Sequence, residues 1–570
     1  MATAGDSVGA WFGADGQINQ LRGRLFKAVC LGATLLTLFL VFVFLVYVAN
    51  DAIQPLTADP RWWVTVVATI PVPALALAAY YYRYDPAAGE VAYTALGLPI
   101  VTSLLAGGIT IFFNHILTPY EWFALVVSVA VAVGVLSVHN QIRDAGAIER
   151  SLVVAVVPLL ALVGIPGIGV DVPIKTPFFG RELFRLSVSI PDLVPGLREL
   201  ILSLPVLPMA SVSLLLTFVV PIAAVVAWHV RDVRGTDRAG LLAGGATVVV
   251  AALGLIVEPL AGFSAVSWLI LTTVVGVPVG LYVDRVRRRG TGVSGLAFPV
   301  VIVAGIAVGA IIVEVAGFGA PNVWTNWGFL TDAHSRTPRE AGIYPALVGS
   351  IMMIIVVGIA AFPLGVGAAI YLEEYAPNDG VLGSVVDLIE INIANLAGVP
   401  SVVYGLLGLA LFVKIGSLRP GIVIVGGLTI ALLILPIVIV SAQEAIRSVP
   451  DSQRQAAYGM GATRWQTVRT IVLPRAMPGI LTGMILALGR AIGETAPLLM
   501  VGVAAVVRIP PTSFFGLFSA MPRQLFAWAR LAKPDFYHGV LAAGVLVLLV
   551  VLLMMNGTAI LLRNKYQRQE

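Results

Sequence analysis

Long runs of apolar residues recur along almost the whole chain, and they constrain its fold more than any other feature. A helix that crosses a lipid bilayer needs about 20 predominantly apolar residues, and fourteen runs approach or exceed that length. Only 11% of the 570 residues are charged, whereas a soluble domain carries about 25%. The sequence therefore predicts an all-α polytopic membrane protein.

The predicted spans form two groups, separated by a basic segment. Eight lie before it, at about 25–49, 62–82, 91–113, 119–138, 150–166, 209–230, 240–258 and 264–283. Six follow, at about 296–317, 343–371, 397–415, 420–441, 478–505 and 537–562. Arg and Lys accumulate in short cytoplasmic loops, and their distribution places both termini on the cytoplasmic side of the cell membrane. One inner segment, 372–396, is acidic and breaks this pattern.

These spans predict four parts of the chain. They are an N-terminal membrane module of about eight helices (1–283), a basic cytoplasmic linker (284–295), a six-helix core (296–562) and a cytoplasmic tail (563–570). The eight-helix module carries no motif that indicates its role.

The sequence lacks the motifs for nucleotide hydrolysis and for metal binding. A phosphate-binding P-loop needs Gly-Lys-Ser/Thr, and no Gly-Lys dipeptide occurs. No metal site is predicted, because the five His are scattered and form no H-E-x-x-H pattern, and no catalytic residue or cofactor is predicted either. The net charge of +5 follows from membrane topology and does not indicate a nucleic-acid partner. If the protein works with ATP, another chain must hydrolyse it.

The longest polar segment predicted on the inner side covers residues 444–479. Residues 455–460 favour a helix, Gly461 ends it, and residues 462–471 can form a second, amphipathic helix that Leu473-Pro474 ends before the next span. Two short helices that meet at a glycine suit docking in a groove of a partner. The alternative is a basic amphipathic linker that lies on anionic lipid.

The spacing within this loop resembles the cytoplasmic signature of ABC-importer permeases. The match consists of Gln455-Ala456-Ala457, three residues, Gly461, nine residues, Ile471, one residue and Leu473-Pro474. Gln455 replaces the usual Glu, which puts any salt bridge from that position in doubt. The resemblance implies that the loop couples the chain to a cytoplasmic ATPase.

Residues 343–505 also resemble the PstA-type permeases of phosphate importers. The matching segments include PLGVGAAIYLEEYAP (363–377), NLAGVPSVVYGLLGL (395–409) and PGILTGMILALGRAIGETAPLL (478–499). The resemblance covers about 296–562 and does not reach the first eight helices. It implies a non-catalytic permease subunit of an ATP-driven phosphate importer. The implied partners are a PstC-like permease, ATPase subunits, an external phosphate-binding protein and the lipid bilayer.

Two charged residues lie within the fifth span of the core. Arg490 and Glu494 are four residues apart, so on one helix they share a face. Ionisable residues at membrane depth usually face a cavity, pair with each other and mark a solute path. A guanidinium binds phosphate oxygens in a two-pronged manner and keeps its charge when buried. The resemblance implies that this segment carries residues needed for phosphate passage, and Thr495 and Ser401 are weaker candidates.

Other interpretations of the same residues stay open at this point. Arg490 and Glu494 could be a structural ion pair that fixes two helices. The substrate could be another oxyanion, such as sulfate or molybdate. A membrane scaffold or phosphate-signalling partner could keep the coupling loop and lack a pathway.

Overall fold

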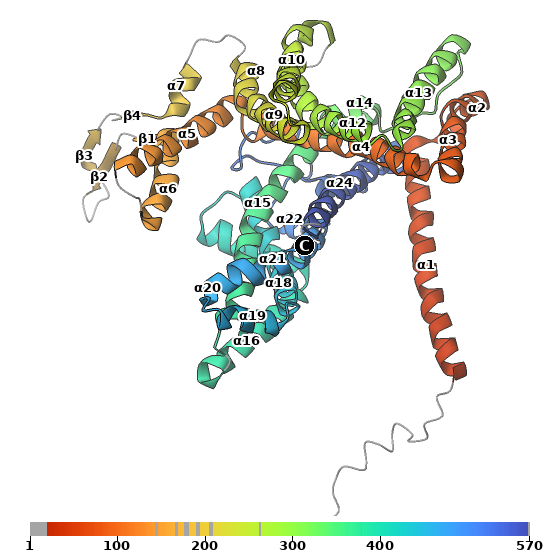
Figure 1. The fold of residues 1–570 in the computed structure, drawn as a ribbon. Helices are drawn as coiled ribbons and strands as arrows, with labels where there is room; N and C mark the ends of the chain where they lie inside the picture. Colours follow the sequence, from red (N-terminus) through yellow and green to blue (C-terminus); the bar gives the residue numbers. More distant parts are fainter. Residues whose placement is uncertain are drawn as a thin grey trace, which may run out of the picture.

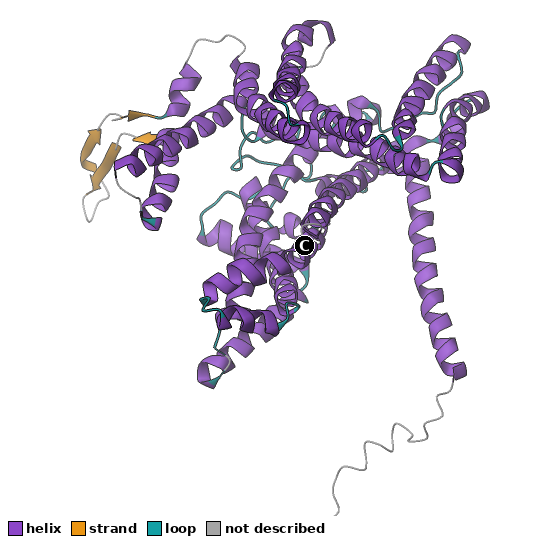
Figure 2. Cartoon of the chain, viewed as in Figure 1, coloured by secondary structure: helices purple, strands orange, loops and turns teal. Residues whose placement is uncertain are grey.

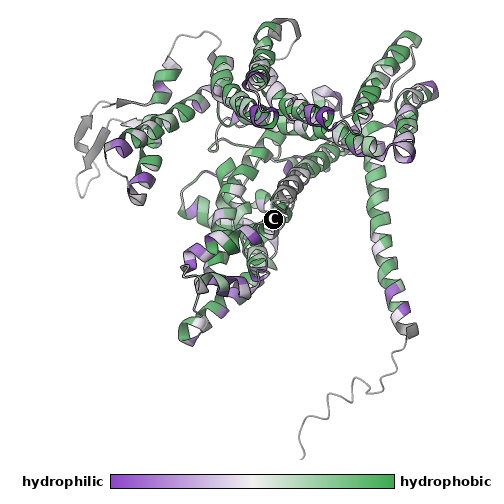
Figure 3. Ribbon diagram, viewed as in Figure 1, coloured by the Kyte–Doolittle hydropathy of each residue, from purple (hydrophilic) through white to green (hydrophobic). Residues whose placement is uncertain are grey.

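The structure is a computed structural model that describes residues 20–142, 146–165, 169–175, 182–189, 194–203, 209–261, 264–377 and 379–567. Within this part the chain is mainly α-helical (Figure 2). Thirteen helical runs of the described residues are long and apolar enough to cross a membrane, and apolar residues predominate along them (Figure 3). The all-α polytopic fold is thus confirmed, and the chain is a multi-pass membrane protein.

Twelve helices precede the predicted core within the described residues. They are α1 (Gln20–Ile53), α2 (Pro60–Thr69), α3 (Pro71–Tyr84), α4 (Pro86–His115), α5 (Pro119–Ile142), α6 (Ala147–Val163), α7 (Leu197–Ser203), α8 (Met209–Leu214), α9 (Val220–Arg234), α10 (Asp237–Ala261), α11 (Ala265–Leu271) and α12 (Val277–Arg289). One turn of π-helix joins α8 to α9 and another joins α11 to α12. Each of these pairs therefore forms one continuous membrane span.

A small pair of β-ribbons lies between α6 and α7 and was not predicted. Strand β2 (Gly169–Lys175) pairs antiparallel with β3 (Glu182–Ser189), and β1 (Gly164–Ile165) pairs with β4 (Val194–Pro195). Both long strands alternate apolar and polar residues, which favours strands over helix. The predicted span at 150–166 is shifted by three residues toward the N-terminus, because α6 ends at Val163 and β1 begins at Gly164.

The C-terminal part contains α13 (Ala297–Ala316), α14 (Trp327–Thr331), α15 (Tyr344–Ile370), α16 (Gly380–Ala397), α17 (Ser401–Gly408), α18 (Val423–Arg447), α19 (Asp451–Gly459), α20 (Arg464–Thr467), α21 (Leu473–Gly493), α22 (Ala496–Met500), α23 (Met521–Trp528) and α24 (Leu541–Gln567). Helix α18 is central and packs against α15, α16, α17, α21 and α22 (Figure 1). Gly427 of α18 packs against Val356 of α15, and Gly483 of α21 packs against Ser441 of α18. Small residues let these helix backbones approach closely.

The two ends of α18 carry different loops. At its start, the backbone N–H groups of Val423 and Ile424 donate to Gly516 O (3.1 Å) and Phe514 O (2.9 Å). At its end, Arg447 leads into α19. A helix of 25 residues is about 37 Å long. The loop 444–479 therefore lies at the opposite end of the core from residues 506–536, as its predicted inner position requires.

Three details of the predicted core are wrong. The predicted span 478–505 is broken, because Glu494 has extended backbone angles (φ −74°, ψ 128°) and Pro497 lies in the first turn of the separate helix α22. The span at 397–415 is reduced to a helical run over 401–415. Most of the segment 372–396 was expected to be an inner loop. Its residues from Gly380 onward form helix α16, although Asp387 and Glu390 lie within it.

Leu473-Pro474 also fails to end the second short helix. A π-helical turn over Val468–Val472 connects α20 directly to α21, and Pro474 lies in the first turn of α21. Wider π-helical hydrogen bonding just before a proline accommodates the missing N–H, so the helical path continues. The loop is therefore continuous with the membrane helix that carries Arg490.

Contacts cross the predicted boundary at 284–295. Helix α1 packs on α24, the last helix, and Asp51 Oδ2 lies 3.1 Å from His538 Nδ1. Helix α13 packs on α2, where its Gly309 lies against the side chain of Thr69. His115 of α4 is hydrogen-bonded to Tyr344 of α15 at 2.7 Å. The division into module, linker and core stays a proposal, and residues 1–19 of the module and 568–570 of the tail lie outside the described residues.

Candidate functional site

Arg490 and Glu494 form an ion pair at the end of α21. Arg490 Nε lies 3.1 Å from Glu494 Oε1, although Glu494 is the first residue after the helix. The contact uses only the inner nitrogen of the guanidinium. Neither terminal amino group of Arg490 has a hydrogen-bond partner among the described residues. Two parallel N–H donors thus remain available to one planar or tetrahedral oxyanion.

The two partners differ in exposure. The side chain of Arg490 is 45% exposed, whereas that of Glu494 is 17% exposed. One turn earlier on the same helix face, Leu486 is 69% exposed. A guanidinium that faced lipid at membrane depth would cost about 2.5–3.5 kcal/mol by insertion scales. This face of α21 is therefore better suited to contact water or another protein than lipid.

The two weaker candidates lie at helix starts near this pair. Thr495 precedes α22 and its side chain makes no capping hydrogen bond, while Ser401 begins α17. Helices α17 and α22 pack together, since a Cβ added to Gly405 would meet Pro497 Cα at 2.8 Å. No described hydrogen bond joins Thr495 or Ser401 to Arg490. Among the described residues, no group of three or more His, Cys, Asp or Glu could hold a metal ion.

The predicted coupling loop forms two short helices with a sharp turn between them. Gly461 has φ +86°, in the left-handed region that glycine adopts without strain. Thr463 then begins α20 with a capping box, in which the side chains of Thr463 and Gln466 each bond the other's backbone N–H. The turn predicted at Gly461 is confirmed.

The small residues of this loop divide between two faces. Gln455 and Ala456 are exposed, whereas Ala457 is 1% exposed and packs inward. Leu473 is half-buried and Pro474 is exposed at the start of α21. Gln455 and Ala456 are thus open to a partner, and Ala457 is not.

Three large apolar side chains close to these residues in the sequence are exposed, and they are called the apolar patch of the loop. Met460 is 82% exposed, Trp465 is 59% exposed and Tyr458 is 41% exposed. They lie on both sides of the turn at Gly461, in a segment that is otherwise polar. Large side chains such as Trp and Tyr are enriched at the centres of protein–protein contacts. The patch is suited to fill a pocket of another protein.

A buried ion pair holds this loop in place, and the sequence reasoning missed it. Arg454 of α19 lies 3.0 Å from Glu374, with side chains that are 15% and 6% exposed. Arg454 also donates to Ile446 O (2.9 Å) and Val449 O (2.5 Å), at the end of α18. One guanidinium thus connects α19, α18 and the turn that follows α15.

A second charge cluster lies next to it. Arg447 is within 2.8 Å of Glu373 and 3.3 Å of Glu390. The side-chain amide of Gln443 donates to both carboxylates, at 3.0 and 3.1 Å. These carboxylates come from the acidic segment 372–396 that broke the charge pattern. That anomaly was the available signal, because acidic residues on an inner segment need basic partners.

The fold and the site define a membrane permease subunit: packed spanning helices, a charged pair within them, and a helical loop with an exposed apolar patch at one end. A family described as "Binding-protein-dependent transport system inner membrane component" matches residues 361–565. Because relatives above 30% identity align over more than two thirds of their own length, the chain belongs to this family.

Two relatives illustrate the similarity. The probable ABC transporter permease protein YqgI of Bacillus subtilis is 34% identical over 240 residues, which are 42% of this chain and 78% of that protein. The phosphate transport system permease protein PstA of Mycobacterium leprae is 37% identical over 39% of this chain and 72% of its own. Among solved structures, an inward-facing MetNI methionine ABC transporter covers 38% of this chain and 93% of its own, at 15% identity and TM-score 0.31.

Proposed function

We propose that this chain is the PstA-like permease subunit of an ATP-driven phosphate importer. The observation that carries the proposal is the guanidinium of Arg490, which lies within a membrane segment, is fixed by Glu494 and keeps two free donor groups. Relatives described as phosphate transport system permeases support phosphate as the substrate.

Phosphate at neutral pH carries between one and two negative charges and offers several acceptor oxygens. The terminal nitrogens of Arg490 would bind two of these oxygens in the geometry that guanidinium groups favour. Glu494 would orient Arg490 and weaken the positive field, so that the anion is released again. Thr495 and Ser401 would contribute hydroxyl groups along the same path.

The exposure of Arg490 supports a pathway shared with a second subunit. Because this face would be costly against lipid, a PstC-like permease would cover it and leave a polar channel between the two chains. An external phosphate-binding protein would deliver the anion at the end that carries residues 506–536. Both chain termini would then lie in the cytoplasm.

The loop 444–479 would couple the permease to ATPase subunits. Gln455 and Ala456 offer a small exposed face, and Met460 and Trp465 offer large apolar groups next to it. A linker lying on lipid is a weaker interpretation, because the buried pair Arg454–Glu374 fixes this loop against the helix ends. The chain itself would hydrolyse no ATP and would need no cofactor.

The test is transport by the assembled complex in proteoliposomes. We expect uptake of radiolabelled phosphate that needs ATP and the binding protein, and that a large excess of sulfate or molybdate does not inhibit. Equal inhibition by sulfate would contradict phosphate as the substrate. A complex that hydrolyses ATP and moves no oxyanion would favour the scaffold interpretation.

A further inference from the structure

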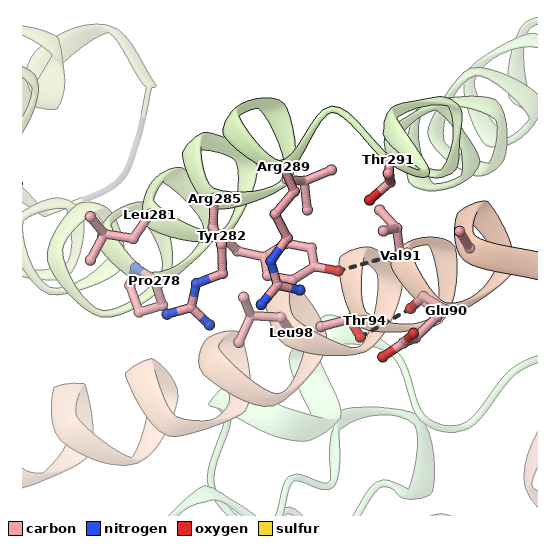
Figure 4. Close-up of a pocket in the computed structure, with 12 residues that line it drawn as sticks. Glu90, Val91, Thr94, Leu98, Pro278, Leu281, Tyr282, Arg285, Arg289 and Thr291 are labelled. Atoms are coloured by element: carbon pink, nitrogen blue, oxygen red, sulfur yellow. Dashed lines mark hydrogen bonds between the residues drawn. The ribbon is translucent and has the colours of Figure 1, made fainter. Parts of the chain in front are cut away.

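The N-terminal module contains a groove of mixed character between α4 and α12. It encloses about 570 Å³, and Figure 4 shows residues of the two helices facing each other across it. A hydrogen bond of 3.3 Å from the Tyr282 hydroxyl to Val91 O joins the two helices. The groove is thus a feature of the packing of α4 against α12.

One end of the groove is basic. Arg285 and Arg289 are one helical turn apart on α12, and both side chains extend into the space between the helices (Figure 4). Neither forms an ion pair among the described residues, whereas the neighbouring Arg288 is paired with Asp284 at 2.8 Å. Glu90 also lines the groove and makes no described ion pair. The lining therefore carries a net charge of +1 from two Arg and one Glu.

The other end of the groove is apolar. Leu98 of α4 and Pro278 and Leu281 of α12 line it. Both helices belong to runs that could cross a membrane, Pro86–His115 and Ala265–Arg289. The basic residues lie at the ends of these runs, and the apolar lining begins about 12 Å further along α4, from Glu90 to Leu98. The positions along the two helices therefore change from polar to apolar in the direction in which a bilayer does, although the guanidinium of Arg285 extends back toward Pro278 (Figure 4).

We propose that this groove binds an anionic phospholipid, with its phosphodiester between Arg285 and Arg289 and an acyl chain along Leu98, Pro278 and Leu281. An anionic phospholipid such as phosphatidylglycerol carries one net negative charge, which balances the net charge of the lining, whereas the ammonium group of phosphatidylcholine cancels the charge of its phosphodiester. Guanidinium groups bind phosphate oxygens in a two-pronged manner, and basic pockets between membrane helices suit phospholipid headgroups.

Two simpler explanations account for arginines at this end of α12, but not for the positions of Arg285 and Arg289 along the groove. Basic residues in the last turn of a helix favour its dipole, and long side chains reach toward water at membrane surfaces. Both explanations apply equally to Arg287, Arg288 and Arg289. Neither explains why Arg285 and Arg289 line a groove that Arg287 does not line.

The test uses the purified full chain in a neutral detergent. Short-chain phosphatidylglycerol, phosphatidylcholine and inorganic phosphate are titrated separately, and binding is measured by the shift of the thermal unfolding midpoint. We expect phosphatidylglycerol to raise the midpoint, and phosphatidylcholine and inorganic phosphate to have little effect. Replacing both arginines, Arg285→Gln with Arg289→Gln, should weaken phosphatidylglycerol binding at least tenfold.

Two further variants make the test specific. Arg287→Gln removes the same charge from the same helix turn and should leave the affinity unchanged. Leu281→Trp fills the apolar end and should weaken binding of the lipid, with both arginines intact. If the double variant does not fold, the single variants Arg285→Gln and Arg289→Gln provide the comparison.

Three outcomes would overturn the proposal. They are an equal effect of phosphatidylcholine, an equal loss in Arg287→Gln, and arginine-dependent binding of inorganic phosphate that matches or exceeds binding of the lipid. The last result would assign the groove to the free anion.

Discussion

Breaking the buried pair between Arg454 and Glu374 should release the coupling helix α19 from the core. In Arg454→Met, the carboxylate of Glu374 stays 6% exposed and loses its only charged partner among the described residues. Removing one partner of a buried ion pair costs about 3–5 kcal/mol. Since about 1.4 kcal/mol is a factor of ten, the population in which α19 is detached should rise roughly 140- to 4,000-fold.

Hydrogen exchange of the backbone amides of α19 measures this population directly. We expect exchange over residues 451–459 to accelerate by about two orders of magnitude or more in the variant, while α15 and α18 keep most of their protection. In the assembled complex, ATP hydrolysis should proceed with less transport. Arg475→Met is the matched control, because Arg475 is exposed and forms no ion pair among the described residues.

A double replacement separates the two contributions of Arg454. Arg454→Met with Glu374→Leu removes the unpaired charge, so part of the protection should return. Val449 O still loses its donor, which costs about 1–3 kcal/mol, whereas Ile446 O keeps the backbone N–H of Val449. Unchanged exchange in Arg454→Met would refute the idea that this pair fixes the loop.

Three further predictions concern other parts of the chain. Gly461→Val should keep membrane insertion but uncouple ATP hydrolysis from transport, because a β-branched residue is strained at φ +86°; normal coupling in the reconstituted complex would count against a docking role. His334 accepts a hydrogen bond from Trp528, and burial, then Arg508, lowers its pKa below the usual 6.5. The contribution of His334 to stability should therefore be constant above pH 6.5 and fall as the pH drops below it, and His334→Phe should remove that part of the slope in thermal unfolding. A chain shortened to residues 284–570 should assemble with its partners and transport phosphate with reduced stability; an assembled complex without uptake would show that the module is required.

Most of the membrane helices could be predicted, because the length of an apolar run is a property of the local sequence. The turn at Gly461 was equally local. Helix α16 was missed, since Asp387 and Glu390 lower the apolar character of a segment whose backbone is helical. The break at Glu494 was not predicted either, because the run stays apolar on both sides of it.

Contacts between distant segments could not be predicted from one sequence. Arg454 and Glu374 are 80 residues apart, and the sequence showed only an acidic and a basic inner segment. The docking of α1 on α24 joins opposite ends of the chain through small apolar residues that carry no distinctive pattern. The pairing of Arg490 with Glu494 was predictable from its spacing, although the observed contact lies at a helix end.

Uptake of radiolabelled phosphate by complexes that carry variants of Arg490 tests the central claim most directly. If Arg490 receives phosphate, Arg490→Lys should reduce uptake while assembly persists, and Arg490→Ala should abolish it. The double variant Arg490→Met with Glu494→Gln removes both charges and the unpaired carboxylate. The account predicts no phosphate uptake by this double variant, and recovery of uptake would contradict the role of Arg490 in the pathway.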